Sequence, residues 1–297
     1  MELNSIEGTS WSPDRQRNPL RDTLRRLLRN KLAVTGLVIL GVLVLSAVFA
    51  GWLAPYDPIK QNLPVRRQPP SLHHPFGLDD LGRDILSRMI YGARLSLRVG
   101  VLSVSLAIAL GTVLGALAGY RGGWVDNAIM RLMDIMLAFP ALLLAIAIVA
   151  ILGPGLTNML FAIGTVSIPT YARLVRSQVL SIREQDYVLA ALAVGVPSGR
   201  ILFRTILPNC ITPIIVQGTL SIATAILDAA GLSFLGLGAQ PPTPEWGAML
   251  GQGRFSMFTA PHIIIFPGLA IGLTVLSFNL LGDGLRDALD PRLRIGY

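Results

Sequence analysis

Six long apolar runs separate the polar segments of this 297-residue chain. Each run is about as long as a helix must be to cross the hydrocarbon core of a bilayer, roughly 20 residues at about 1.5 Å each. The pattern therefore predicts an all-α, polytopic membrane protein. Its six expected transmembrane helices cover residues 33–53, 99–120, 128–152, 157–175, 211–232 and 262–282.

Prolines interrupt three of these runs. Pro140, Pro169 and Pro267 are expected to kink the third, fourth and sixth helices. Proline has this effect because it lacks a backbone N–H and its ring clashes with the preceding turn.

Three glycines, Gly111, Gly115 and Gly119, follow one another at four-residue spacing in the second run. Such a ridge of small residues lets another helix pack closely. It predicts either a surface between subunits, where helices could slide, or static packing against a helix of the same chain.

Basic residues near the ends of the runs set the predicted orientation. Residues 1–32 are rich in arginine, and the apolar positions from Leu20 to Leu32 predict an amphipathic helix along the cytoplasmic face. Residues 33–297 then form the membrane domain. Arginines also follow the fourth and sixth runs, so the positive-inside rule places both chain ends in the cytoplasm. The first outer loop is also basic, but the reverse orientation would put three other basic segments outside.

A charged cluster lies in that first outer loop. Asp79 and Asp80 are expected to cap a short helix whose apolar stripe, between Ile85 and Ile90, rests on the outer membrane surface. The cluster either orders an outer vestibule or gate, or forms a surface ion-pair cluster; it comprises Asp79, Asp80, Gly82, Arg83 and Asp84. The adjacent His73 and His74 would point in opposite directions on extended chain, so we expect no metal site.

Acidic residues are rare inside the runs. Asp228 lies about one turn from the outer end of the fifth run, where it either belongs to the pathway or its gate, or simply reaches water. Arg131 and Asp134 are three residues apart in the third run and are expected to pair on one helical face.

The segment 183–208 between the fourth and fifth runs has the pattern of a broken helix. One face at helical spacing carries Tyr187, Ala191, Val194 and Gly195. Gly195, Pro197 and Gly199 are expected to break the helix and restart it, with Ser198 capping the second piece and Pro208 closing the unit. The small residues would let a partner surface approach closely. The alternative is an amphipathic linker lying on the membrane.

Several positions of this segment match a known motif. It resembles the cytoplasmic loop of permease subunits of bacterial ATP-driven importers, which carries E-A-A, then Gly, then a closing Leu-Pro; the matching residues are Ala190, Ala191, Gly195, Leu207 and Pro208. Leu189 stands where the family often has Glu, and Thr205 where Ile is common. In that family the loop forms a coupling helix that docks on a separate ATPase subunit. The resemblance implies this role here, with Tyr187 and Val188 beside the matched residues.

Three further stretches resemble the C-type permeases of dipeptide, oligopeptide and nickel importers. They are GLDDLGRD at 77–84, FLGLGAQPPTPEWG at 234–247 and the tail GDGLRDALDPRLR at 282–294. The resemblance covers about Lys31 to Arg294 and implies the type I importer permease fold in a bacterial inner membrane. It also implies partners: membrane lipid, a homologous second permease subunit in a heterodimer, one or two cytoplasmic ATPase subunits that bind ATP and Mg²⁺, and an external solute-binding protein. The expected function is half of a translocation pathway for short peptides; a nickel or glutathione importer is the alternative within the family.

Motifs for catalysis are not found in the sequence. The only lysines, Lys31 and Lys60, do not complete a nucleotide-binding G-x-x-x-x-G-K-[ST], and neither H-E-x-x-H nor G-x-S-x-G occurs. We therefore expect no enzyme activity and no cofactor in this chain. The net charge of +8 comes mostly from arginines near the ends of the runs, so it does not indicate nucleic-acid binding. A functional alternative of another class is a proton- or cation-driven transporter using Asp134 and Asp228, although no internal repeat supports it.

Overall fold

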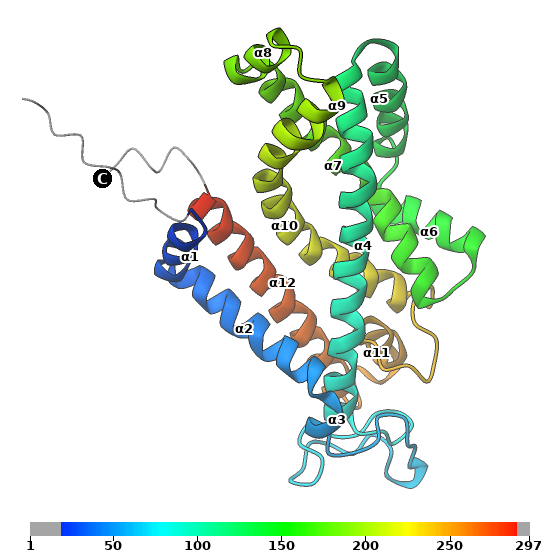
Figure 1. Cartoon of the computed structure of the whole chain (residues 1–297). Helices are drawn as coiled ribbons and strands as arrows, with labels where there is room; N and C mark the ends of the chain where they lie inside the picture. Colours follow the sequence, from blue (N-terminus) through cyan, green and yellow to red (C-terminus); the bar gives the residue numbers. More distant parts are fainter. Residues whose placement is uncertain (1–18, 290–297) are drawn as a thin grey trace, which may run out of the picture.

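The computed structural model describes residues 19–289, and within them the chain is built from helices with a single isolated β-bridge (Figure 1). The α-helices are α1 (Pro19–Arg29), α2 (Lys31–Val48), α3 (Ala50–Leu53), α4 (Ile85–Arg121), α5 (Gly123–Leu137), α6 (Ala141–Leu152), α7 (Leu156–Arg183), α8 (Asp186–Ala193), α9 (Ser198–Ile201), α10 (Leu207–Phe234), α11 (Trp246–Gly253) and α12 (His262–Leu289). The short turns are the 3-10 helices η1 (Leu63–Val65) and η3 (Arg254–Ser256) and the π-helical turn η2 (Leu202–Ile206). Most of the basic N-terminal segment and the last arginines of the tail lie outside the described residues.

Four helical stretches within residues 19–289 are long and apolar enough to cross a membrane: Lys31–Val48, Ile85–Arg121, Ser198–Phe234 and His262–Leu289. The pair α5 and α6 is a fifth candidate, bent by 93° at the break before α6. Pro140 lies in this break and is the N-cap of α6. The predicted interruption of the third run at Pro140 is therefore confirmed, and it is a sharp break rather than a gentle kink.

The predicted fourth span, 157–175, is covered by α7, which does not reach the same apolarity. Polar residues interrupt its apolar ones at Thr157, Asn158, Thr165, Ser167 and Thr170. Helix α7 runs on to Arg183 and packs along α4, where its buried residues include Ala162, Tyr171 and Val175. The six expected spans thus correspond to four apolar helical stretches, one broken pair and this more polar helix.

The expected short helix on the outer membrane surface was wrong. Helix α4 begins at Ile85, where Asp84 is the N-cap and its carboxylate accepts the backbone N–H of Ser87 at 2.8 Å. From there α4 continues without a break for 37 residues through the predicted second span. Ile85 is fully buried and Met89 packs against the same core cluster, while Leu86 and Ile90 are half-buried, so the stripe is partly covered by the protein itself.

Helix α4 packs against α5 and α7 on one side and against α2 and α12 on the other (Figure 1). The three glycines of its ridge lie against α7: an added Cβ at Gly115 would come within 2.4 Å of the carbonyl oxygen of Ala172, and Gly111 and Gly119 are similarly close to α7. Here the ridge packs against a helix of the same chain. Helices α2 and α12 lie side by side on the other flank of α4 (Figure 1).

Candidate functional site

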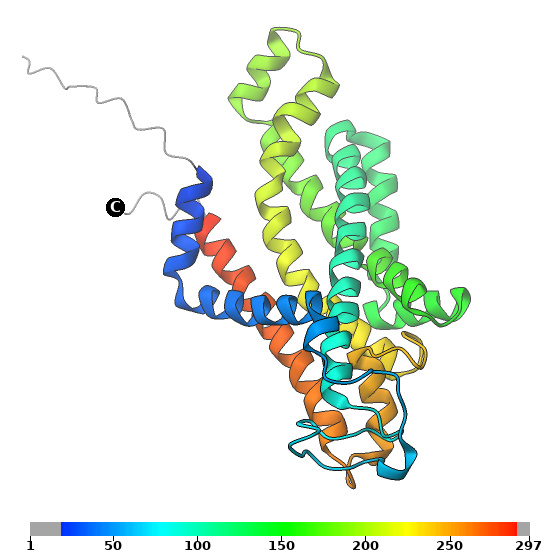
Figure 2. The same ribbon diagram turned by 60° about the horizontal axis from the view of Figure 1, so that its bottom comes forward.

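The segment 183–208 stands at one end of the molecule, and the charged loop before α4 lies at the opposite end (Figures 1 and 2). The predicted helix break in 183–208 is confirmed, because α8 ends at Ala193 and α9 starts at Ser198. Gly195 takes a φ of +79° in the break, a conformation that favours glycine. The expected Ser198 cap was wrong: Pro197 is the N-cap of α9, and no side chain caps it.

The underside of the segment is anchored in the core. Val188 of α8 is 0% exposed and belongs to one apolar cluster with Val179 of α7 and with Ile201 and Ile206. Cys210, which follows on α10, is also buried in this cluster. Of the residues predicted to contact an ATPase, Val188 therefore faces this chain's own core.

The segment also exposes large apolar side chains, called its exposed apolar face below, beside the exposed charged residues Asp186, Arg200 and Arg204. Its large exposed side chains are Tyr187, Leu189, Leu192, Val194 and Phe203. Val194 is 79% exposed and Phe203 70% exposed. Ala190, Gly195 and Pro208 are exposed as well, while Ala191 and Leu207 are half-buried. Helix α8 is only eight residues long, and Phe203 belongs to the candidate stretch Ser198–Phe234.

The sequence-based argument overlooked Leu192 and Phe203 as part of this exposed face. Leu192 lies next to the matched motif, and its apolar side chain at the end of a short helix was a usable signal. Phe203 sits in the π-helical turn, whose register the sequence pattern does not indicate.

Two ion pairs fix α5 to α7 near this end. Arg173 donates to Asp134 at 2.6 Å, and Arg176 makes a two-pronged contact with Asp126. The expected Arg131–Asp134 pair was wrong, since the partner of Asp134 comes from another helix. Asp134 is 52% exposed, which indicates a solvated surface pair.

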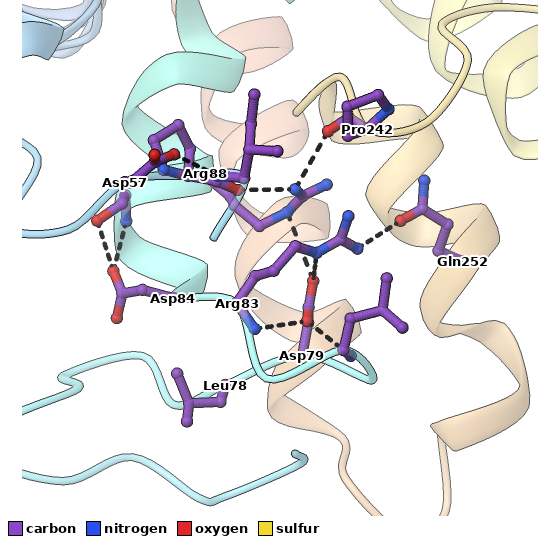
Figure 3. A network of polar contacts seen from close by, with 12 residues as sticks. Asp57, Leu78, Asp79, Arg83, Asp84, Arg88, Pro242 and Gln252 are labelled. Carbon is purple, nitrogen blue, oxygen red and sulfur yellow. Dashed lines mark hydrogen bonds and ion pairs between the residues drawn. The ribbon is translucent and has the colours of Figure 1, made fainter. Parts of the chain in front are cut away.

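The charged loop at the other end is a buried network (Figure 3). One oxygen of Asp79 accepts the backbone N–H of Leu81 and of Arg83, both at 2.9 Å. The other oxygen accepts Nε of Arg83 at 2.6 Å, and Arg83 in turn donates to Gln252 of α11 at 2.9 Å. Asp79, Arg83 and Asp84 are all buried, so the interpretation as a surface ion-pair cluster was wrong for them.

The remaining residues of the loop are held just as closely. Asp80 is half-buried and binds Arg67 and the hydroxyl of Ser256. Asp84 binds His74 at 2.9 Å. A Cβ at Gly82, whose φ is +71°, would lie 1.9 Å from the carbonyl oxygen of Asn62, so only glycine fits there. No group of three or more His, Cys, Asp or Glu side chains suited to a metal occurs among residues 19–289.

Arg88 is a member of this network that the sequence argument did not identify. It is 0% exposed, and Nη1 donates to the carbonyl oxygens of Pro58 at 3.0 Å and Pro242 at 3.4 Å. Its Nε lies 3.5 Å from Asp79. We expected the start of this helix to lie on the membrane surface, so the burial of Arg88 was not predicted.

Asp228 is not part of this network. It is half-buried on α10 and has no hydrogen bond or ion pair within the described part of the chain. Its predicted role in a pathway or gate stays a prediction.

Comparisons with known proteins bear on most of the chain. Residues 111–295 match the model of the family "Binding-protein-dependent transport system inner membrane component", and residues 18–70 match "N-terminal TM domain of oligopeptide transport permease C". The dipeptide transport system permease protein of Alkalihalophilus pseudofirmus is 54% identical over 277 residues, which cover 93% of this chain and 91% of the relative. The glutathione transport system permease protein of Escherichia coli is 51% identical over 286 residues, 95% of this chain and 93% of the relative.

A likeness to a solved structure concerns the fold. A chain of the MetNI methionine ABC transporter in an inward-facing conformation aligns with a TM-score of 0.57 at 18% identity. The alignment covers 68% of this chain and 97% of that chain. The expected importer permease fold is therefore confirmed.

Proposed function

Since this chain belongs to the binding-protein-dependent transport system inner membrane components and is a permease subunit of an ATP-driven importer, we propose that it forms half of a translocation pathway for short peptides. The second half is a homologous but distinct permease subunit. One or two cytoplasmic ATPase subunits bind ATP and Mg²⁺, and a solute-binding protein delivers the substrate from outside. The chain itself supplies no catalytic site.

The exposed apolar face of 183–208 carries the proposal for coupling. An exposed apolar patch marks a contact with a protein or with a membrane, and the motif matched in 183–208 favours the protein. Because the same segment is anchored through Val188 and Ile206, a push on Tyr187, Val194 or Phe203 is passed to α7 and α10. This segment and both chain ends face the cytoplasm of a bacterium, and the Asp79 network faces outward.

The names of the relatives favour short peptides as substrates. One relative transports dipeptides and another glutathione, itself a short peptide, according to their names. Nickel is less favoured because the external loops hold few His and Met residues. Identifying the molecule that the solute-binding protein retains on purification tests this choice; retained nickel would contradict it.

The coupling role is tested by Gly195→Arg. A bulky, charged side chain in the middle of the apolar face would prevent close approach of the ATPase. We expect retention of the co-expressed ATPase on the purified permease complex to fall more than about tenfold, which corresponds to a loss of about 1.4 kcal/mol.

The control for this experiment is Gly236→Arg. Gly236 also has a positive φ, of +82°, and an added Cβ would meet nothing within 4 Å, as at Gly195. It lies in the loop after α10, far from 183–208, so both variants suffer the same backbone strain and only one alters the proposed contact. Equal retention of the ATPase by the two variants would contradict the coupling role. Uptake by this chain alone, driven by a proton gradient, would contradict the whole proposal.

A further inference from the structure

A cavity of about 240 Å³ opens beside the Asp79 network. Its walls come from the loop before α4, the first turn of α4, α11 and the start of α12, and include Asp79, Arg83, Arg88, Met249, Gln252 and Ile263. By the same measure a single water needs only about 10–15 Å³. The cavity, called the Arg88 pocket below, is thus large enough for a polar group larger than water.

Arg88 has unused hydrogen-bonding capacity in this pocket. Nη1 binds two backbone carbonyl oxygens, but the buried Nη2 has no hydrogen-bond partner within the described residues. A buried donor left unpaired costs on the order of 1–3 kcal/mol, more when it is charged. Figure 3 shows the guanidinium groups of Arg83 and Arg88 lying one above the other, both directed toward the side where Pro242 and Gln252 lie.

Two buried guanidinium groups share one carboxylate at this pocket. Both Arg83 and Arg88 contact Asp79. Asp80 pairs with Arg67, and Asp84 makes its side-chain contact with His74 rather than with Arg88. The 3.5 Å contact with Asp79 is therefore the one ion pair of Arg88 among the described residues, in a buried site where electrostatic attraction is much stronger than in water.

We propose that the Arg88 pocket binds a carboxylate group that comes from outside this chain. A guanidinium is planar and offers paired donors that match a carboxylate, and the buried positive charge of Arg88 supplies the attraction. The carboxylate is either an Asp or Glu side chain of the external solute-binding protein or the terminal carboxylate of a peptide on its way through. Both candidate sources of the carboxylate follow from the proposed function. The proposal that the pocket binds a carboxylate does not depend on that function.

The first test supplies the carboxylate from within the chain. Met249 lines the pocket and is buried, so Met249→Glu places a carboxylate there, and Met249→Gln is the neutral match. We expect M249E to melt at least about 2 °C above M249Q in detergent, because the new charge pairs with Arg88. M249E melting at or below M249Q overturns the proposal, since the pocket would then hold only water. This result does not depend on transport.

The second test identifies the source of the carboxylate. The complete transporter with its ATPases is placed in lipid nanodiscs, carrying Arg88→Gln, Arg88→Lys or the control Arg66→Gln, an exposed arginine of the same loop. If a side chain of the binding protein occupies the pocket, R88Q weakens its affinity about tenfold, R88K less, and R66Q leaves it unchanged. If the peptide carboxylate occupies the pocket instead, R88Q leaves the affinity for the binding protein unchanged.

If the peptide carboxylate occupies the pocket, the effect of R88Q appears in the transport of a chosen dipeptide. ATP-driven uptake of Ala-Ala is compared with that of its C-terminal amide, which lacks the carboxylate. R88Q should lose the preference for the free acid that the wild type and R66Q show. R88Q behaving like R66Q in both affinity and uptake overturns the proposal.

Discussion

The two ends of this molecule are built on opposite principles. At one end, segment 183–208 presents an apolar surface on a short, broken helix, with Val188 beneath it as an anchor. At the other end, the Asp79 network buries charged groups and satisfies most of them internally. The first end leaves large apolar side chains exposed, and the second is largely completed by contacts within the chain.

The glycines at the two ends illustrate the same difference. Gly195 and Gly82 both have positive φ values. A Cβ at Gly195 would meet nothing within 4 Å, whereas one at Gly82 would collide with the backbone of Asn62. Glycine is therefore needed at Gly82 for close packing, but at Gly195 only for the turn, which leaves room for another protein.

The largest expected effect comes from breaking the buried end. Asp79→Ala removes the carboxylate that Arg83 and Arg88 share and leaves two buried guanidinium groups unpaired. Removing one partner of a buried ion pair typically costs about 3–5 kcal/mol. We expect the thermal unfolding of purified protein to show this loss, or the protein to fail to accumulate.

The matched control is Asp57→Ala in the same loop. Asp57 is exposed and accepts one backbone N–H, that of Ile59. Its loss should cost about 1 kcal/mol. If both variants were equally stable, the Asp79 network would contribute no more than an exposed turn, and the contrast between the two ends would be lost.

A smaller effect separates the two faces of segment 183–208. Val188→Ala opens a cavity in the core and should reduce stability by about 2 kcal/mol. Val194→Ala removes the same atoms from an exposed position, so stability should change by less than about 0.5 kcal/mol. Retention of the ATPase should show the reverse order. Val194→Ala should weaken it more than Val188→Ala does, although Val194→Ala costs less stability. Equal stability losses in the pair would show that α8 has no buried side.

How far the sequence predicts this molecule depends on how local each signal is. Apolar runs and prolines act within their own helix, and for that reason the long apolar helices and the break at Pro140 were predicted. The 93° bend there depends on packing, which the sequence pattern does not contain. The burial of Arg83 depends on Gln252, 169 positions away, so the local pattern of charges could only suggest an exposed helix cap.

The candidate site was predicted unevenly for the same reason. The motif in 183–208 pointed to Gly195 and Pro208 as candidate coupling residues. The helical period could not show that Val188 faces inward, because the helix breaks after Ala193 and both pieces pack over the core. Arg88 was overlooked because its environment comes from the segments around Pro58 and Pro242, which are far apart in the sequence.

The smallest expected effect concerns the exposed ion pair of α5 and α7. Asp134→Asn removes a partner of Arg173 in a pair whose two side chains are about half exposed, so the loss should stay below about 1 kcal/mol. Because exposed charges are screened within about 8 Å at physiological ionic strength, even this difference should shrink in high salt. Wild type and variant are compared by thermal unfolding at low and high salt, and by ATP-driven peptide uptake. Uptake should be retained under the proposed coupling through 183–208, because that mechanism needs no proton to pass through Asp134. Loss of uptake at unchanged stability would instead favour an acid-based transport mechanism in which Asp134 takes part.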